Sequence, residues 1–176
     1  MYKMPRKGLS EKPLEEIENL KKMGYPVTLA GDVVGTGSSR KSATNSVLWH
    51  MGEDIPFIPN KKTGGICIGS KIAPIFFNTM EDAGTLVFEA DVDKLSTGDL
   101  ISIYPHEGKI KDENNKIITS FELKSETFLD EVRAGGRIPL IIGRSLTDKS
   151  REFLDLPSTD VFVRPGLGDE SKDGYT

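Results

Sequence analysis

The chain has 176 residues, which fits one domain and leaves little room for a second. Its 23 Lys and Arg against 27 Asp and Glu give a formal charge of −4, so it is not a general polyanion binder, because such binding needs clustered basic side chains. No apolar run approaches the roughly 18 residues of a membrane span, and the N-terminus lacks the apolar core of a secretory signal.

Apolar spacing and helix-stop residues define the elements expected before residue 52. Leu14, Ile17 and Leu20 recur at helical spacing and predict a first helix. A later helix is expected to end at Gly52, and the residues on its apolar side are Ala43, Val47, Leu48 and Met51. In chain order we expect a loose basic arm (1–10), a helix capped by Ser10 (11–23), a short buried strand (25–30), a glycine-rich turn (31–40) and a helix (39–51).

The rest of the chain alternates short strands with helices. Eighteen Gly and ten Pro imply many turns, so an α/β fold, a compact mixed sheet flanked by helices, is favoured over a helical bundle. We expect strands at 55–59, 65–69, 85–90, 100–104 and 116–123, helices at 74–82, 125–133, 139–144 and 148–154, the last capped by Thr147, and a hairpin turn at Asn114–Asn115. The ordered domain is predicted to span 11–165, and 166–176 to form a linker-like tail.

A strand that runs into a glycine turn and then a helix makes 31–40 the most informative segment. Gly35 and Gly37 permit unusual backbone angles and close approach. The first free N–H groups of the following helix point at whatever lies above the turn. Ser38 and Ser39 are placed both to cap the helix and to bond a ligand, and Arg40 adds a fork suited to a carboxylate. This segment therefore predicts an anion site.

Three known loop types do not match this segment. It lacks the Gly-Lys-Ser/Thr of a Walker A loop and the third glycine of a dinucleotide fingerprint, and neither serine lies in a nucleophile elbow. The residues alone leave two interpretations open: an anion site, or a capped helix after a tight turn with Arg40 in solvent. They also leave open whether Arg137 and Arg144, which bracket an apolar stretch, reach a substrate.

The sequence of this loop and several segments after it resemble those of a known family. Residues 35–49 read Gly-Thr-Gly-Ser-Ser-Arg-Lys-Ser-Ala-Thr-Asn-Ser-Val-Leu-Trp, which is similar to the swivelling-domain signature of the aconitase superfamily. Three further segments, at 55–60, 71–84 and 131–144, resemble the bacterial aconitase B type in particular. The resemblance covers about residues 12–165. It implies the swivelling β/β/α fold.

The resemblance also implies a function, the hydro-lyase reaction of the tricarboxylic acid cycle that interconverts citrate, cis-aconitate and isocitrate. Ser38 matches the serine that acts as general base, and Ser38, Ser39 and Arg40 match the substrate contacts. This chain is then expected to be a lid on the cluster-bearing domains of the same enzyme, inactive alone, and to begin after a segment that carries a further substrate arginine.

The iron–sulfur chemistry of that family is expected to lie outside this chain. A single thiol, Cys67, holds neither a 4Fe-4S cluster nor a zinc ion, so no metal is assigned to these residues. Cys67 sits in a small apolar strand and is expected to be a buried structural thiol. A single cysteine forms no internal disulfide, which fits a reducing, cytoplasmic setting. Two alternatives stay open: the small subunit of a related hydro-lyase such as isopropylmalate isomerase, and an RNA-binding module of a cluster-free aconitase.

Overall fold

The computed structural model describes residues 12–125 and 127–159. The expected arm at 1–10, which includes the helix-capping residue Ser10, and the expected tail at 166–176 lie outside the described residues. Within the described residues, no helix has both the length and the apolar composition needed to span a bilayer.

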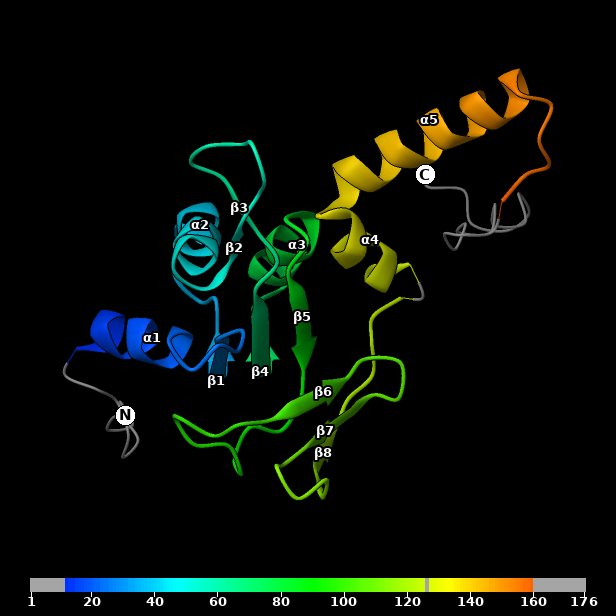
Figure 1. Cartoon of the computed structure of the whole chain (residues 1–176). Helices are drawn as coiled ribbons and strands as arrows, with labels where there is room; N and C mark the ends of the chain where they lie inside the picture. Colours follow the sequence, from blue (N-terminus) through cyan, green and yellow to red (C-terminus); the bar gives the residue numbers. More distant parts are fainter. Residues whose placement is uncertain (1–11, 126, 160–176) are drawn as a thin grey trace, which may run out of the picture.

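Three parallel strands form the centre of the domain. They are β1 (Thr28–Val34), β4 (Ile66–Ile72) and β5 (Leu86–Glu89), and they pair in the order β1-β4-β5. Helix α2 (Arg40–Met51) comes after β1 in the chain, and helix α3 (Pro74–Asp82) follows β4 (Figure 1). The central strand β4 is largely buried, whereas β1, at one edge of the sheet, is half-buried.

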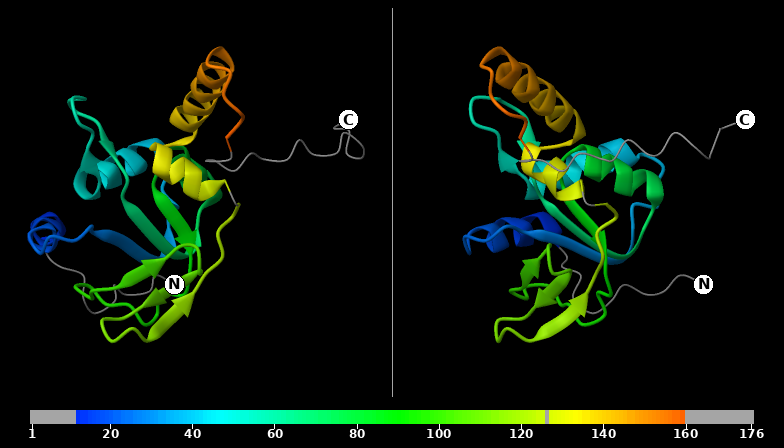
Figure 2. Two further views of the ribbon diagram at one scale, coloured as in Figure 1. Left: turned by 45° about the vertical axis from the view of Figure 1, so that its right-hand side comes forward. Right: turned by 90° about the vertical axis from the view of Figure 1, so that its right-hand side faces the viewer.

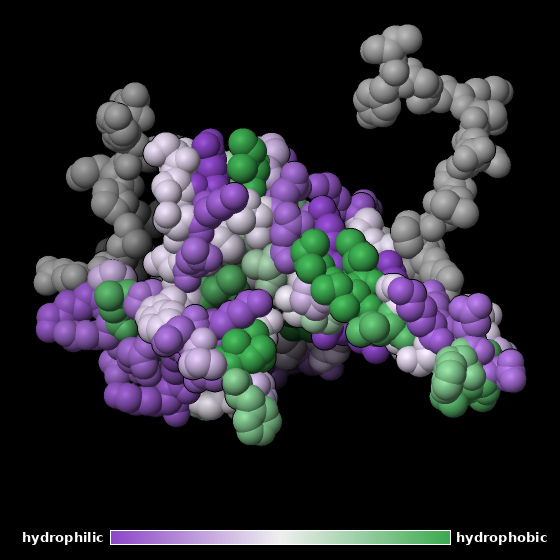
Figure 3. All heavy atoms as spheres, turned by 90° about the horizontal axis from the view of Figure 1, so that it is seen from above, coloured by the Kyte–Doolittle hydropathy of each residue, from purple (hydrophilic) through white to green (hydrophobic). Residues whose placement is uncertain are grey.

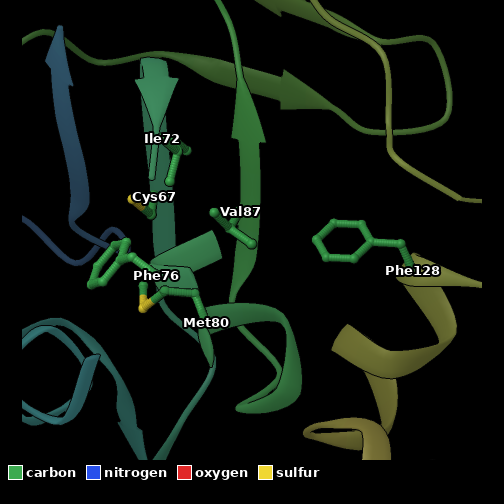
Figure 4. Close-up of a cluster of buried hydrophobic side chains, with 6 residues drawn as sticks. All are labelled: Cys67, Ile72, Phe76, Met80, Val87 and Phe128. Atoms are coloured by element: carbon green, nitrogen blue, oxygen red, sulfur yellow. The ribbon is translucent and has the colours of Figure 1, made fainter. Parts of the chain in front are cut away.

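The two faces of this sheet carry separate apolar cores. Successive side chains of a strand point to opposite faces, so Cys67 and Val87 lie on one face and their neighbours Ile68 and Phe88 on the other. The first core adds side chains from α3 and α4 (Figure 4), among them Phe76, Met80 and Phe128. Burial on both faces accounts for the consecutive apolar residues Ile66–Ile68 in β4 and Leu86–Phe88 in β5.

An antiparallel sheet supplies the second core. Its strands are β6 (Ser102–Tyr104), β7 (Lys109–Lys111) and β8 (Ile117–Ser120), in the order β6-β7-β8. Ile110 and Phe121 pack there, and the Phe121 ring stacks on Phe88 at 3.9 Å between ring centroids. Two-residue strands β2 (Glu53–Asp54) and β3 (Lys62–Thr63) form a separate hairpin. The fold is therefore α/β, with its parallel and antiparallel pairs in different sheets.

The remaining helices lie at the ends of the described chain. Helix α1 (Pro13–Lys21) precedes the sheet, and α4 (Phe128–Ala134) and α5 (Arg137–Phe153) follow it. Gly135 ends α4 in the left-handed conformation, as its position predicts. Figure 2 shows α5 extending away from the body, on the side opposite the antiparallel sheet.

An ion-pair junction holds the base of α5. Arg137 lies 3.3 Å from Glu81, 3.1 Å from Asp82 and 3.3 Å from Glu131, so it joins α3, α4 and α5. Burial, followed by the nearby Glu131 carboxylate, raises the pKa of Glu81. Arg144, about two turns further along the same side of α5, lies 3.6 Å from the buried carboxylate of Asp130.

Several expected elements differ from the structure. The predicted turn at 31–40 is wrong in its first part, because β1 continues to Val34. The predicted strand at 55–59 is a turn, since two of its five residues are prolines without an N–H to pair. The helices expected at 139–144 and 148–154 are one helix, because no proline separates them and Thr147 lies in its interior. On α2, Ala43 was expected on the apolar side of the helix, but its side chain is exposed. The neighbouring Thr44 is buried instead.

The junction predicts a pH-dependent loss of stability that Glu81 controls. Because the folded protein holds the Glu81 proton more tightly than the unfolded chain, ionisation disfavours folding as pH rises above the ordinary value of 4.5. The Glu81→Gln variant lacks this ionisation, so its free energy of unfolding relative to the original chain should rise with pH above that value. Urea unfolding at a series of pH values measures this difference, and parallel curves for the two proteins would contradict it.

Candidate functional site

The candidate site is the loop of residues 35–39 between β1 and α2. It lies at the carboxyl end of a parallel strand, which is the edge where open α/β sheets bind ligands. The backbone N–H of Ala73 donates to the carbonyl of Val34 at 2.9 Å, so the chain entering α3 is tied to the last residue of β1. The start of the loop is therefore fixed by both neighbouring elements.

Gly35 brings the loop into direct contact with α3. It has a φ of 79°, and a Cβ placed on it would overlap the side chain of Phe76, which is 1% exposed. Both observations require glycine at this position. A Cβ on Gly37 would meet nothing within 4 Å, so the second glycine leaves open space above the loop.

The N-terminus of α2 is open to a ligand. Ser39 is the N-cap residue, but it makes no side-chain capping bond; its hydroxyl donates to the Ser42 hydroxyl at 2.8 Å. The expected capping by Ser39 is therefore wrong. The N–H of Ala43 donates to the Ser39 carbonyl, and the N–H groups of the three residues before it are those that a helix leaves without an internal partner. The first turn carries no acidic residue.

Arg40 begins α2 and folds back over the loop. One of its terminal nitrogens, Nη1, donates to the Ser38 carbonyl at 3.4 Å. Its Nε is buried and has no hydrogen-bond partner among the residues described here, and the same holds for the hydroxyl of Thr44, one turn further along. The guanidinium is thus only partly engaged, and it lies beside the exposed Ser38 and Ser39.

These features of the loop are ones that favour the binding of an anion. The helix dipole and the first-turn N–H groups favour negative charge, and the partly engaged Arg40 adds a positive one. Ser38 and Ser39 lie on the surface, without a covering element over them in the part of the chain that the structure describes. Sequence reasoning did not identify Thr44 or Phe76 as part of this region. The signal for Thr44 was its spacing, four residues after Arg40 on the same helix face.

The other residues that the sequence analysis singled out belong to the framework. Arg137 and Arg144 are held in ion pairs at the base of α5. The side chain of Cys67 is fully buried in the core, and burial raises its pKa to about 12. Cys67 is the one cysteine of the sequence, and an iron–sulfur cluster is held by several cysteine thiolates, so these residues do not fit such a cluster. The described residues also contain no group of three or more metal-binding side chains.

Comparison with known proteins identifies the family of this chain. The family described as the aconitate hydratase 2 N-terminus matches residues 1–175. Aconitate hydratase B of Synechocystis is 62% identical over 93% of this chain, and that of Pseudomonas aeruginosa is 56% identical over all of it. The chain belongs to this aconitate hydratase family. It spans about a fifth of the length of these curated relatives (19% and 21%).

A solved structure shows the same fold at greater distance. It is 3-isopropylmalate dehydratase from Methanocaldococcus jannaschii, with a TM-score of 0.57 and 24% identity. The likeness covers 76% of this chain and 74% of that one. It confirms the expected fold class, the α/β arrangement that the aconitase resemblance implies.

The contact between Gly35 and Phe76 predicts unequal effects for the two loop glycines. Gly35→Ala should lower the free energy of unfolding by about 1–3 kcal/mol, because the methyl group meets Phe76 at a positive φ. Gly37→Ala is the matched control and should change stability by less than about 0.5 kcal/mol. Urea unfolding measures both, and equal effects of the two substitutions would contradict the seating of the loop on α3.

Proposed function

We propose that this chain contributes the Ser38–Arg40 loop to the active site of an aconitate hydratase, which interconverts citrate, cis-aconitate and isocitrate. The observation that carries the proposal is the open N-terminus of α2, which carries a Gly-Ser-Ser-Arg sequence and no acidic residue in its first turn. A substrate with three carboxylates needs such a concentration of positive potential. The names of the relatives at 62% and 56% identity support this choice of substrate.

Ser38 is proposed as the group that moves the carbon-bound proton. Dehydration removes a proton from carbon and a hydroxyl from the adjacent carbon to give cis-aconitate, and hydration in the other sense gives the isomer. The Ser38 hydroxyl is a weak base, so its alkoxide form needs stabilisation. The N–H groups of the first turn of α2 and the charge of Arg40 supply it, most strongly when the site is closed and dry.

Ser39 and Arg40 are proposed to hold carboxylates of the substrate. A guanidinium binds a carboxylate through two parallel N–H bonds, which fixes the orientation as well as the position of the ligand. Nε of Arg40 is covered in this structure, so a carboxylate engages the terminal nitrogens unless the side chain turns. The Ser39 hydroxyl, bonded to Ser42, can exchange that partner for the ligand.

The exposed loop supports a lid role for this domain. Ser38 and Ser39 lie on the open surface, so closure over a substrate needs a second surface from elsewhere in the longer enzyme. Closure of that kind completes the site and excludes water. The iron–sulfur cluster that the resemblance implies is assigned to that other part, since the residues described here do not fit it.

The two alternative functions have weaker support. The likeness to 3-isopropylmalate dehydratase is one of fold, whereas the relatives of high identity are aconitate hydratases. The names of these relatives do not mention RNA, and the chain carries a net charge of −4. Assays with isopropylmalate in place of citrate distinguish the first alternative, and the proposal expects no turnover of isopropylmalate.

Ser38→Ala tests the role of the proposed base. The full-length enzyme carrying this sequence should lose about 10²–10⁴-fold in the rate of cis-aconitate formation from citrate, because the carbon-bound proton has no acceptor. Ser46→Ala is the matched control: an exposed serine two turns further along α2, whose loss should leave the rate unchanged. A Ser38→Ala enzyme within a few-fold of the original rate would remove Ser38 from the reaction.

Arg40→Lys tests the carboxylate contact. A lysine keeps the charge but not the fork, so kcat/KM for citrate should fall about 10- to 100-fold, as expected for the loss of a charge-assisted bond. Lys41→Arg, at the exposed neighbouring position, serves as the control and should have little effect. Unchanged steady-state kinetics for Arg40→Lys would show that Arg40 does not bind the substrate.

A further inference from the structure

Helix α5 contacts the body of the domain along one side only. Its 17 residues span about 26 Å, and Figures 1 and 2 show it projecting from the domain. Leu140 is its one buried residue, and Arg137 and Arg144 anchor the same side by ion pairs. Most of the helix is therefore free of the domain that it belongs to.

The opposite side of α5 carries a stripe of apolar side chains, with the exposed polar residues Ser145, Lys149 and Glu152 between them in its second half. At about 100° per residue, the stripe positions lie roughly 100–240° around the helix from Leu140, away from the body. Figure 3 shows apolar side chains gathered over this helix. The stripe consists of Ile138, Ile141, Ile142, Leu146 and Phe153, which are 64%, 54%, 52%, 60% and 88% exposed. Next to Leu146 and Phe153 lies a shallow hollow of about 340 Å³.

The described chain after α5 does not cover the stripe. The N–H of Leu156 donates to the Arg151 carbonyl at 2.9 Å, and the Arg151 side chain contacts the Pro157 carbonyl. Arg151 lies about 20° around the helix from Leu140, so these contacts direct the chain along the side that faces the body. The residues described up to 159 therefore leave the stripe open on the other side.

We propose that this stripe docks into an apolar groove on the part of the longer enzyme that lies outside the matched region. The curated relatives are about five times as long as this chain, so a large body is available for the contact. A helix of this length and about 10 Å width offers an outer face of roughly 400 Å². That is about half of what each partner buries in a stable interface, so a pair of α5 helices from two copies is too small.

A groove that surrounds the helix buries its flanks as well as its outer face, which is why a larger body fits better than a second copy. The Arg137 junction holds α5 at a fixed angle to the sheet that carries the Ser38 loop. Docking of the stripe therefore sets the position of the loop relative to the rest of the enzyme. This inference rests on the proposed function only in assuming that the longer protein is an aconitate hydratase.

The test uses hydrogen exchange in the full-length enzyme carrying this sequence. Exchange of α5 amides is compared between the original enzyme and the double variant Ile142→Glu, Leu146→Glu. We expect slow exchange in the original and at least tenfold faster exchange in the variant, with exchange in β4 unchanged as proof of folding. Ile117→Glu on β8 is the matched control, since Ile117 is 51% exposed and Ile142 is 52% exposed, and it should not alter α5 exchange.

Two results would overturn the docking proposal. One is fast α5 exchange in the original full-length enzyme. The other is slow exchange that becomes fast when the enzyme is diluted to monomers, which would assign the stripe to a second copy. The Ser38→Ala assay is independent of both. Loss of activity in Ser38→Ala together with fast α5 exchange would contradict docking alone, and normal activity with protected α5 would contradict only the proposed role of Ser38.

Discussion

The contact between the backbone of Gly35 and the side chain of Phe76 fixes the geometry on which the candidate site depends. Phe76 belongs to the core between α3 and the parallel sheet, so its position is set by buried packing. The chain leaving β1 passes directly over it, which only glycine permits. The N-terminus of α2 is thereby held at the carboxyl edge of the sheet. A rigid core thus positions a loop whose own side chains are exposed.

Two surfaces of the described residues carry the two proposals. One is polar, the Ser38–Arg40 loop with an uncapped helix behind it. The other is apolar, the outer side of α5. They are linked through the sheet, α3 and the Arg137 junction. Under the proposed lid role, this link would couple the position of α5 to the position of the Ser38–Arg40 loop.

Much of the fold was predictable because its signals are local. The helices at 40–51 and 74–82 and the strands at 66–72 and 86–89 follow from apolar spacing, Pro74 and the glycines that end them. The single helix α5 was predicted as two, because Thr147 is both a capping residue and a tolerated interior residue, and only tertiary contacts decide between these roles. The separation of the antiparallel strands into their own sheet depends on long-range packing around Phe88 and Phe121, which no local pattern specifies.

The candidate site was predictable in composition but not in geometry. The Gly-Ser-Ser-Arg sequence located the loop, yet the sequence did not show that Ser39 bonds Ser42 and leaves the helix uncapped. Nor did it show that Gly35 is required by Phe76 while Gly37 faces open space. These facts depend on residues distant in sequence or on a choice between hydroxyl partners.

Citrate titration of this chain, followed by NMR of its backbone amides, tests the central claim most directly. The account predicts that the largest shifts occur at the first-turn amides of Arg40, Lys41 and Ser42, and that sulfate competes for the same amides. In the Arg40→Gln variant, the citrate-induced shifts of those amides should become smaller, and no other group of amides should shift in their place. Shifts spread over the surface lysines, or no response at Arg40–Ser42 at saturating citrate, would contradict an anion site at the start of α2.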